Sequence, residues 1–123
     1  IAKISKIKFN ENSKTQAFSN FFPELNHNEM VGFSNLVMSP FFIIFKSKFT
    51  FERNHKRIKI FTDIMIDKGI SVEIIDMKGD NNLEEMMYAY YLTDHITYYL
   101  AEAYHIDPEP VSMVEEFKKL LEK

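Results

Sequence analysis

The stretch PFFIIFKSKFTFERNHKRIKIFTDIMIDKGISVEIIDMKGD, residues 40–80, decides the fold. It contains an apolar run at 41–45, a longer segment at 54–68 with one apolar face, and a second apolar run at 70–77. The two short runs predict buried strands, because apolar runs bounded by turn residues are typical of covered strands. The segment between them predicts a helix that a glycine ends. A strand, a helix and a strand in this order indicate an α/β fold with parallel strands.

Helices are also predicted on both sides of this unit. The isoleucines at positions 1, 4 and 7 recur every three residues, which favours a short amphipathic helix before a loop at 10–13. A long helix is predicted at 83–104, with its core stripe formed by Met86, Met87, Tyr90, Tyr91, Tyr98, Leu100 and Ala101. The remaining expected elements are a helical piece at 14–22 stopped by Pro23, a turn through Gly32 capped by Asn26, a turn at 107–110 and a last helix at 111–121.

The composition bounds the function. With 46% hydrophobic residues over 123 positions, the chain is long enough to bury one core. A net charge of −3 gives no electrostatic support for nucleic-acid binding. The absence of cysteine excludes disulfides and thiolate chemistry and fits a cytoplasmic protein, and no apolar run reaches the length of a membrane span. We also find no metal-ligand spacing and no glycine-rich phosphate loop, so we expect neither a metal nor another cofactor.

Two polar segments are candidates for chemistry. The first, NENSKT at 10–15, carries Glu11, and the second, FPELNHNEMVG at 22–32, carries His27. A carboxylate and an imidazole that are brought together make a proton-shuttling pair, because each can be tuned to titrate near neutrality. The density of Asn, Glu and His in the second segment exceeds what a turn requires.

These two segments resemble the C-terminal half of the bifunctional phosphoglucose/phosphomannose isomerases, a sugar isomerase (SIS) family. The later segments DHITYYLA at 94–101, DPEPV at 107–111 and EFKKL at 116–120 follow the family's closing pattern in the same order. A lone Asp-Pro-x-Pro would be weak, but the ordered set is specific. One departure is the run Tyr104-His105-Ile106 before Asp107, where family members usually carry a glycine.

The resemblance implies a three-layer α-β-α domain of SIS type with a mostly parallel sheet. It also implies that residues 1–123 are the C-terminal domain of a two-domain enzyme. In the family a strand lies just before the segment that starts at Ile1, and two strands are too few for a stable sheet alone. Because the chain starts with Ile1 rather than Met, we expect that this first strand and an N-terminal SIS domain lie upstream.

The resemblance also assigns roles. Glu11 would be the base that moves a proton between C1 and C2 of a hexose 6-phosphate through an enediolate, and His27 and Lys118 would open the sugar ring. The phosphate-binding loop would belong to the N-terminal domain. The family is independent of metals and forms homodimers in which the histidine reaches into the partner's site.

Each assignment has a structural alternative. Glu11 could be a solvated loop carboxylate, His27 a hydrogen-bonded structural histidine, and Lys118 a lysine on the wet face of a terminal helix. Two other functions stay open for the whole chain: a non-catalytic regulatory domain that binds a sugar phosphate, and a dimerisation module.

Overall fold

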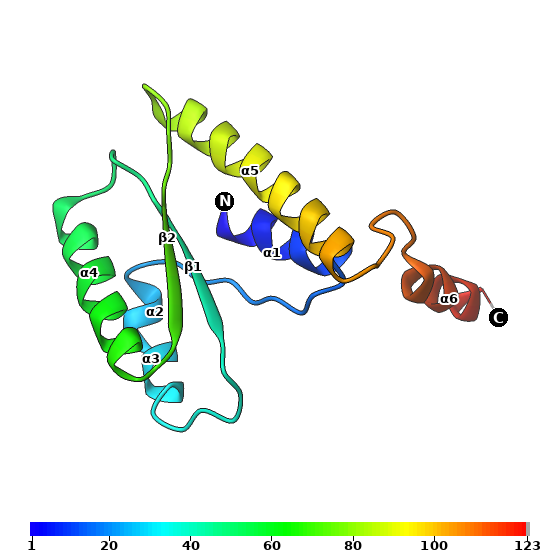
Figure 1. The fold of residues 1–123 in the computed structure, drawn as a ribbon, viewed down its shortest axis with the longest axis horizontal. Coiled ribbons are helices and arrows are strands. Elements are labelled where there is room, and N and C mark those ends of the chain that lie inside the picture. Colours follow the sequence, from blue (N-terminus) through cyan, green and yellow to red (C-terminus); the bar gives the residue numbers. More distant parts are fainter. Residues whose placement is uncertain (123) are drawn as a thin grey trace.

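A computed structural model of the chain describes residues 1–122 (Figure 1). Six helices and two strands make up this part of the chain. In order they are α1 (Ala2–Glu11), α2 (Glu24–His27), α3 (Glu29–Gly32), β1 (Phe41–Lys46), α4 (Glu52–Asp67), β2 (Ser71–Asp76), α5 (Asn82–Ala103) and α6 (Ser112–Leu121).

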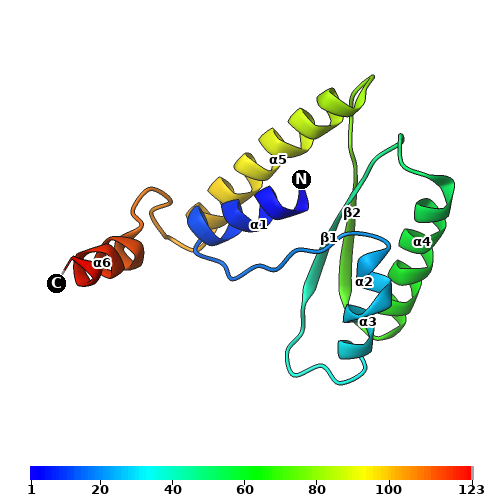
Figure 2. The ribbon, with the colours of Figure 1, turned by 180° about the vertical axis from the view of Figure 1, so that it is seen from behind.

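The two strands pair in parallel, as the sequence predicts. Their register runs from Phe41 opposite Ser71 to Lys46 opposite Asp76, and α4 makes the crossover between them. Helices α2, α3 and α4 lie on one side of the sheet, and α1 and α5 lie on the other (Figures 1 and 2). Covering both faces is typical of parallel sheets, because their strands carry apolar side chains on both sides.

The hydrophobic core lies between the sheet and α4. Phe61 and Met65 of α4 are each 1% exposed and pack near Ile44 of β1 and Leu25 of α2. The Phe61 ring meets the edges of neighbouring aromatic rings, with its centroid 5.2 Å from that of Phe42. The apolar face that the sequence assigned to this helix is therefore the face that builds the core.

A second, polar contact joins α1 to α5. Ser5 Oγ lies 3.1 Å from Thr93 Oγ1, and the Asn12 side-chain amide donates to Thr97 Oγ1 over 2.9 Å. Thr93 and Thr97 are fully buried. Buried hydroxyls are costly unless they are hydrogen-bonded, so these contacts fix where α1 sits along α5.

Both predicted helices form, as α1 and α5, but the faces predicted to pack are largely wrong, and of the predicted α5 stripe only Ala101 is fully buried. Residues Met86, Met87, Tyr91 and Tyr98 of α5 are 42–56% exposed, and Ile4 and Ile7 of α1 are also exposed. The buried positions of α5 recur every four residues and are mostly small: Glu85, Ala89, Thr93, Thr97 and Ala101. Small side chains let α1 pack close to α5, so the larger apolar side chains lie outside the α1–α5 contact.

The helix predicted at 14–22 is also wrong, because residues 14–21 form no helix or strand. The Asn10 side chain bonds to both backbone groups of Ala17, at 3.4 Å each, and side-chain bonds of this kind compete with helix formation. Phe18 and Phe21 stay exposed, whereas Phe22 reaches the core against Phe61. An irregular segment is thus needed to carry the chain from α1 to the far side of the sheet.

Asn26 does not cap the next turn. Its side-chain nitrogen donates to the Met30 sulfur at 3.1 Å, and two short helices, α2 and α3, replace the single turn, with Asn28 between them.

The last helix, α6, stands apart from the rest of the molecule. The chain leaves α5 at Tyr104 and turns through residues 107–110 before α6 begins (Figures 1 and 2). All ten residues of α6 are exposed. Every helix in the part of the chain that the structure describes is too short or too polar to cross a lipid bilayer.

Candidate functional site

Glu11 is the last residue of α1, and the chain around it is firmly held. Ser13 is fully buried and donates to the Phe9 carbonyl at 2.7 Å, which closes the helix end. Lys14 adopts a left-handed backbone, with φ of 52°, and donates to the carbonyls of Glu11, at 2.5 Å, and Pro108, at 3.0 Å. The helix extends two residues, Asn10 and Glu11, into the loop predicted at 10–13.

The neighbours of Glu11 explain why its carboxylate is exposed. Asn12 and Ser13 turn inward and use their side chains to anchor the helix end to α5 and to α1 itself, whereas Glu11 is exposed. Within residues 1–122 the Glu11 carboxylate accepts no hydrogen bond and forms no ion pair. A free carboxylate on a rigid backbone can accept a proton from a bound molecule without first breaking a protein contact.

His27 is the last residue of α2 and lines an open hollow of about 320 Å³. The other residues around the hollow are Pro23, Glu24, Asn26 and Arg57. The exposed imidazole faces a region that holds one guanidinium and one carboxylate, a combination that can bind a polar or anionic ligand. Arg57 comes from α4 and ends the run ERNHKR at 52–57, where the sequence favours a solvated helix start over the binding of an anionic ligand.

The sequence predicts that the polar neighbours of His27, which are Glu24, Asn26, Asn28 and Glu29, either orient its ring or cap a turn, and the structure shows no hydrogen bond from any of them to the ring within residues 1–122. The Asn28 amide donates to Glu24 at 2.7 Å, and the Asn20 amide donates to Glu29 at 2.7 Å. In the described part of the chain the imidazole itself forms no hydrogen bond. These Asn–Glu pairs therefore stabilise the short helices rather than fixing the position of the ring.

Lys118 lies on α6, where its ammonium group forms an ion pair with Glu115 at 2.8 Å. Both side chains are more than half exposed, so the pair is weak. Helices α2 and α6 lie at opposite ends of the molecule, and α1 lies between them (Figures 1 and 2). One copy of the chain thus does not bring Glu11, His27 and Lys118 together.

Other charged residues have structural roles. For Asp94 the sequence predicts a structural role, with either a backbone amide or a basic group as its partner, and the structure shows an ion pair with Lys8 across the α1–α5 contact. The Lys8 ammonium also lies 3.9 Å from the centre of the Tyr90 ring. Burial lowers the pKa of Lys8, but hydrogen bonds with Asp94 and Tyr90 and their charges raise it more, so the net pKa lies above the ordinary value of 10.5.

Glu85 is a buried carboxylate that the sequence did not single out. It is 1% exposed and accepts hydrogen bonds from the Ser47 hydroxyl and, at 3.1 Å, from the Lys48 backbone amide. It thereby joins the first turn of α5 to the loop that follows β1. A glutamate in the first turn of a helix is usually exposed to solvent, where its negative charge interacts favourably with the helix dipole, so the sequence does not predict the burial of Glu85.

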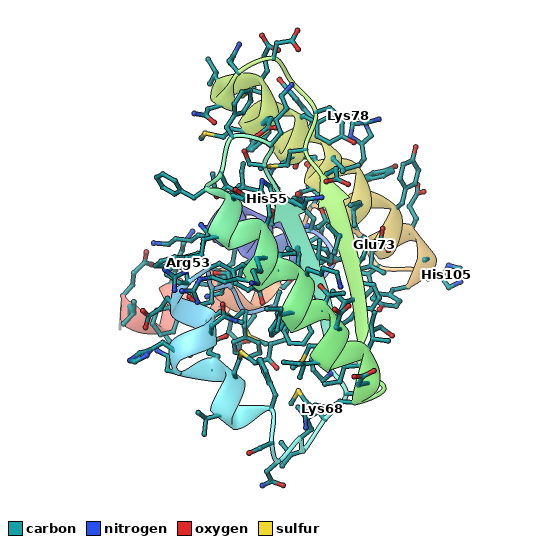
Figure 3. All side chains as sticks on the ribbon, turned by 90° about the vertical axis from the view of Figure 1, so that its left-hand side faces the viewer. Arg53, His55, Lys68, Glu73, Lys78 and His105 are labelled. Carbon is teal, nitrogen blue, oxygen red and sulfur yellow. The ribbon has the colours of Figure 1, made fainter. Side chains whose placement is uncertain are left out.

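His55 was expected at a solvated helix start. Figure 3 shows His55 near the start of α4, two residues after Arg53 in the chain. The residue is partly buried, and its Nδ1 is shielded with no hydrogen-bond partner within residues 1–122. In the same range no three acidic or histidine side chains gather as a metal ion would require.

Comparison with known proteins identifies the family. A model of the bacterial phospho-glucose isomerase C-terminal SIS domain matches residues 1–121. The chain belongs to this family. As a SIS-type α/β domain it carries the parallel sheet described above.

Curated relatives of this SIS domain agree. The chain is 36% identical over 116 residues to a bifunctional phosphoglucose/phosphomannose isomerase of Thermoplasma volcanium, covering 93% of this chain and 36% of that protein. It is 33% identical over 132 residues to the protein of that name from Aquifex aeolicus, covering 100% and 39%. The chain thus spans little more than a third of the length of these relatives. No solved structure matches it.

Proposed function

We propose that residues 1–123 form the C-terminal domain of an enzyme that interconverts glucose 6-phosphate, or mannose 6-phosphate, with fructose 6-phosphate. The family match over residues 1–121 carries this proposal. The free Glu11 carboxylate on the rigid end of α1 supports it, because aldose–ketose isomerisation needs a positioned base.

In this proposal Glu11 takes the proton from C2 of the aldose and returns it to C1 of the enediolate, and the reverse reaction uses the same group. His27 and Lys118 exchange protons with the ring oxygen and the anomeric hydroxyl, which opens the sugar ring. The Arg57 guanidinium beside His27 would favour an anionic ligand in that hollow.

The separation of the three residues sets a requirement on assembly. Because α1, α2 and α6 lie apart in one copy, a complete site needs groups from a second copy or from another part of the longer protein. We propose a homodimer in which one protomer contributes His27 to its partner's site. An N-terminal SIS domain would supply the phosphate anchor.

The decisive experiment uses the complete protein and replaces Glu11→Gln. This substitution keeps the size and hydrogen-bonding capacity of the side chain but removes the base. In a coupled assay of fructose 6-phosphate isomerisation we expect kcat to fall by about 100-fold or more, with the affinity for fructose 6-phosphate preserved.

Glu73→Gln is the matched control. Glu73 is an exposed carboxylate on β2, and it stands on a different element from the three proposed catalytic groups (Figure 3). The control should keep full turnover. Retained turnover in the Glu11→Gln enzyme would remove Glu11 from the mechanism, and sugar-phosphate binding without turnover in the unaltered enzyme would favour a regulatory domain.

A further inference from the structure

The segment that follows α5 is attached to the rest of the molecule by one side chain. The Lys14 ammonium group donates to the Pro108 carbonyl at 3.0 Å. Within residues 1–122 this is the one hydrogen bond that joins residues 107–122 to the rest of the chain, and no ion pair joins them. Helix α6 is exposed along its whole length, so packing adds little to this attachment. The position of the start of α6 therefore depends on Lys14.

The same ammonium group also binds the residue that carries the proposed base. Lys14 donates to the Glu11 carbonyl at 2.5 Å, so one side chain bridges the end of α1 and the turn before α6. Two of the segments that resemble the isomerase family, NENSKT and DPEPV, meet at this contact. In Figures 1 and 2, α1 ends beside the end of α5, from which the chain runs to α6. Lys14 thus links the element that bears Glu11 with the element that bears Lys118.

The turn transmits this contact to α6 because it is stiff. Its two prolines restrict the backbone, and the Asp107 carboxylate accepts a hydrogen bond from the Glu109 amide at 2.9 Å. Helix α6 begins at Ser112, so Lys118 stands roughly 9 Å along the helix from its start. A rotation of about 10° at the turn would move a group at that distance by roughly 1.5 Å. A misplacement of about 1 Å at a reacting group can lower a rate about 100-fold.

The backbone of Lys14 also points to a role for its side chain. Its φ of 52° is a left-handed conformation that strains a residue with a Cβ atom and that glycine adopts freely. Strained conformations persist where the surrounding structure holds them, and they gather at functional sites. A glycine would relieve the strain here but would lose the ammonium group. A lysine at a position that suits glycine is explained by the two carbonyls that its side chain binds.

Glu11 depends much less on Lys14 than the turn does. The end of α1 keeps two further anchors, the hydrogen bonds that the Asn12 and Ser13 side chains donate at 2.9 and 2.7 Å. Removing the Lys14 side chain would leave both of these bonds intact while releasing the turn before α6. The loss would then fall on Lys118 rather than on Glu11.

We propose that Lys14 is a positioning residue, which fixes the start of α6 beside Glu11 and thereby sets where Lys118 meets the sugar. This role rests on the proposed function, in which Lys118 opens the sugar ring, but the attachment itself is measured without turnover. Lys14 does not contact the substrate, so the affinity for fructose 6-phosphate is left to other groups. Wherever α6 packs in the complete protein, its start stays next to the base.

Hydrogen exchange followed by mass spectrometry measures the attachment in the complete protein. In Lys14→Met the amides of residues 107–115 should exchange about threefold faster or more, because the contact that holds the turn is lost. Lys6→Met is the matched control, since Lys6 is an exposed lysine of the same helix whose ammonium group has no partner within residues 1–122. The control should leave the exchange unchanged. Unchanged exchange in Lys14→Met would overturn the attachment.

Turnover of fructose 6-phosphate separates positioning from folding and from binding. Lys14→Met should lower kcat about 10- to 100-fold with KM nearly unchanged, and Lys14→Arg, which keeps the charge and the reach, should recover most of the rate. Lys14→Gly should lower kcat to a similar extent while Tm stays within about 2 °C, because the relieved backbone offsets the lost hydrogen bonds. A rise in KM with kcat unchanged would make Lys14 a substrate-binding group, and a loss of rate that only follows a loss of Tm would make it a structural one. Either result overturns the proposal.

A double-mutant cycle tests the route through Lys118. Lys118→Gln alone should lower kcat, and adding Lys14→Met should lower it further by about threefold or less, because a residue that acts through Lys118 has nothing left to position. Two losses that multiply would show independent roles and would overturn the proposal. An unaffected Lys118→Gln enzyme would refute the ring-opening role and the positioning role together. A slow Lys118→Gln enzyme beside an unaffected Lys14→Met enzyme would refute the positioning role alone.

Discussion

Replacing His105→Gly should stabilise the protein. His105 follows the C-terminal end of α5 and adopts a left-handed backbone with φ of 56°. Its amide donates to the Glu102 carbonyl, and the Ile106 amide donates to the Ala101 carbonyl, both at 2.9 Å. This is the hydrogen-bonding pattern in which glycine is the preferred residue, because a Cβ atom is strained at positive φ.

The magnitude follows from two opposing terms. A residue with a side chain costs about 1–2 kcal/mol in the left-handed conformation. Glycine returns part of this gain, because its more flexible unfolded chain loses about 0.4–1 kcal/mol more entropy on folding. The exposed imidazole projects away from the molecule and contributes no hydrogen bond within residues 1–122 (Figure 3). We therefore expect a net gain of about 0.5–1 kcal/mol, which raises Tm by roughly 2–4 °C in a domain of this size.

Thermal unfolding followed by circular dichroism, together with guanidinium unfolding, measures the effect. His105→Ala is the control, because it removes the imidazole but keeps the Cβ atom and should therefore leave Tm nearly unchanged. Asn tolerates positive φ, so His105→Asn should fall between the two. If His105→Gly melts at or below the temperature of the unaltered protein, backbone strain at this position does not limit stability.

Three further substitutions test other parts of the fold. Asp94→Asn removes the partner of Lys8 and should cost about 1 kcal/mol at neutral pH. Because the folded-state pKa of Lys8 is raised, the contribution of this pair is complete below pH 10.5 and is lost as pH rises through the folded pKa. The fall in Tm as the pH rises above 10.5 should therefore be smaller in the variant. Gly79→Ala should lower the free energy of unfolding by about 2–3 kcal/mol in denaturant unfolding, because a Cβ atom there would lie 2.5–2.8 Å from atoms of the first turn of α5. Gly69→Ala is the comparison: its φ is also positive but the space around it is open, so it should cost only about 1 kcal/mol. Glu85→Ala removes a buried carboxylate and leaves the part-buried donors of Ser47 and Lys48 without their acceptor, so it should cost about 1–3 kcal/mol. A Tm within one degree of the unaltered protein would refute that role.

The regular part of the fold was predictable because periodicity reports burial directly. The apolar runs at 41–45 and 70–77 became β1 and β2, and the apolar face between them became the core face of α4. The segment at 14–22 failed because the spacing of its apolar residues imitates a helix. The interaction that decides its structure, between the Asn10 side chain and the Ala17 backbone, has no effect on the spacing of apolar residues and so cannot be predicted from it.

The α1–α5 contact shows a second limit. Hydrophobicity predicts which side chains prefer burial, but helices that approach closely select small side chains instead. Thr93 and Thr97 were therefore buried while Tyr91 and Tyr98 remained outside. The family resemblance indicates only that the run Tyr104-His105-Ile106 lacks a glycine, and the positive φ of His105 identifies the position at which a glycine would relieve strain.

The candidate site was predicted as a set of residues but not as a geometry. The sequence could indicate Glu11, His27 and Lys118 because short motifs preserve residue types. It placed them on three separate elements, as the structure does, but it could not indicate the distances between these elements, because periodicity reports the burial of a face and not the position of one element relative to another (Figure 1).

The hydrogen bonds between α1 and α5 also bear on the order of folding. They join residues 85–88 positions apart, whereas β1 and β2 pair across 30. Closing the longer loop costs about 1 kcal/mol more in chain entropy, so the β1–α4–β2 unit can form before α1 docks. Amide hydrogens of α1 should then exchange with solvent through partial openings, while those of β1 and α4 wait for the whole molecule to unfold. Among the helices that pack on the sheet or on α5, α1 is thus the last to join the fold and the first to leave it.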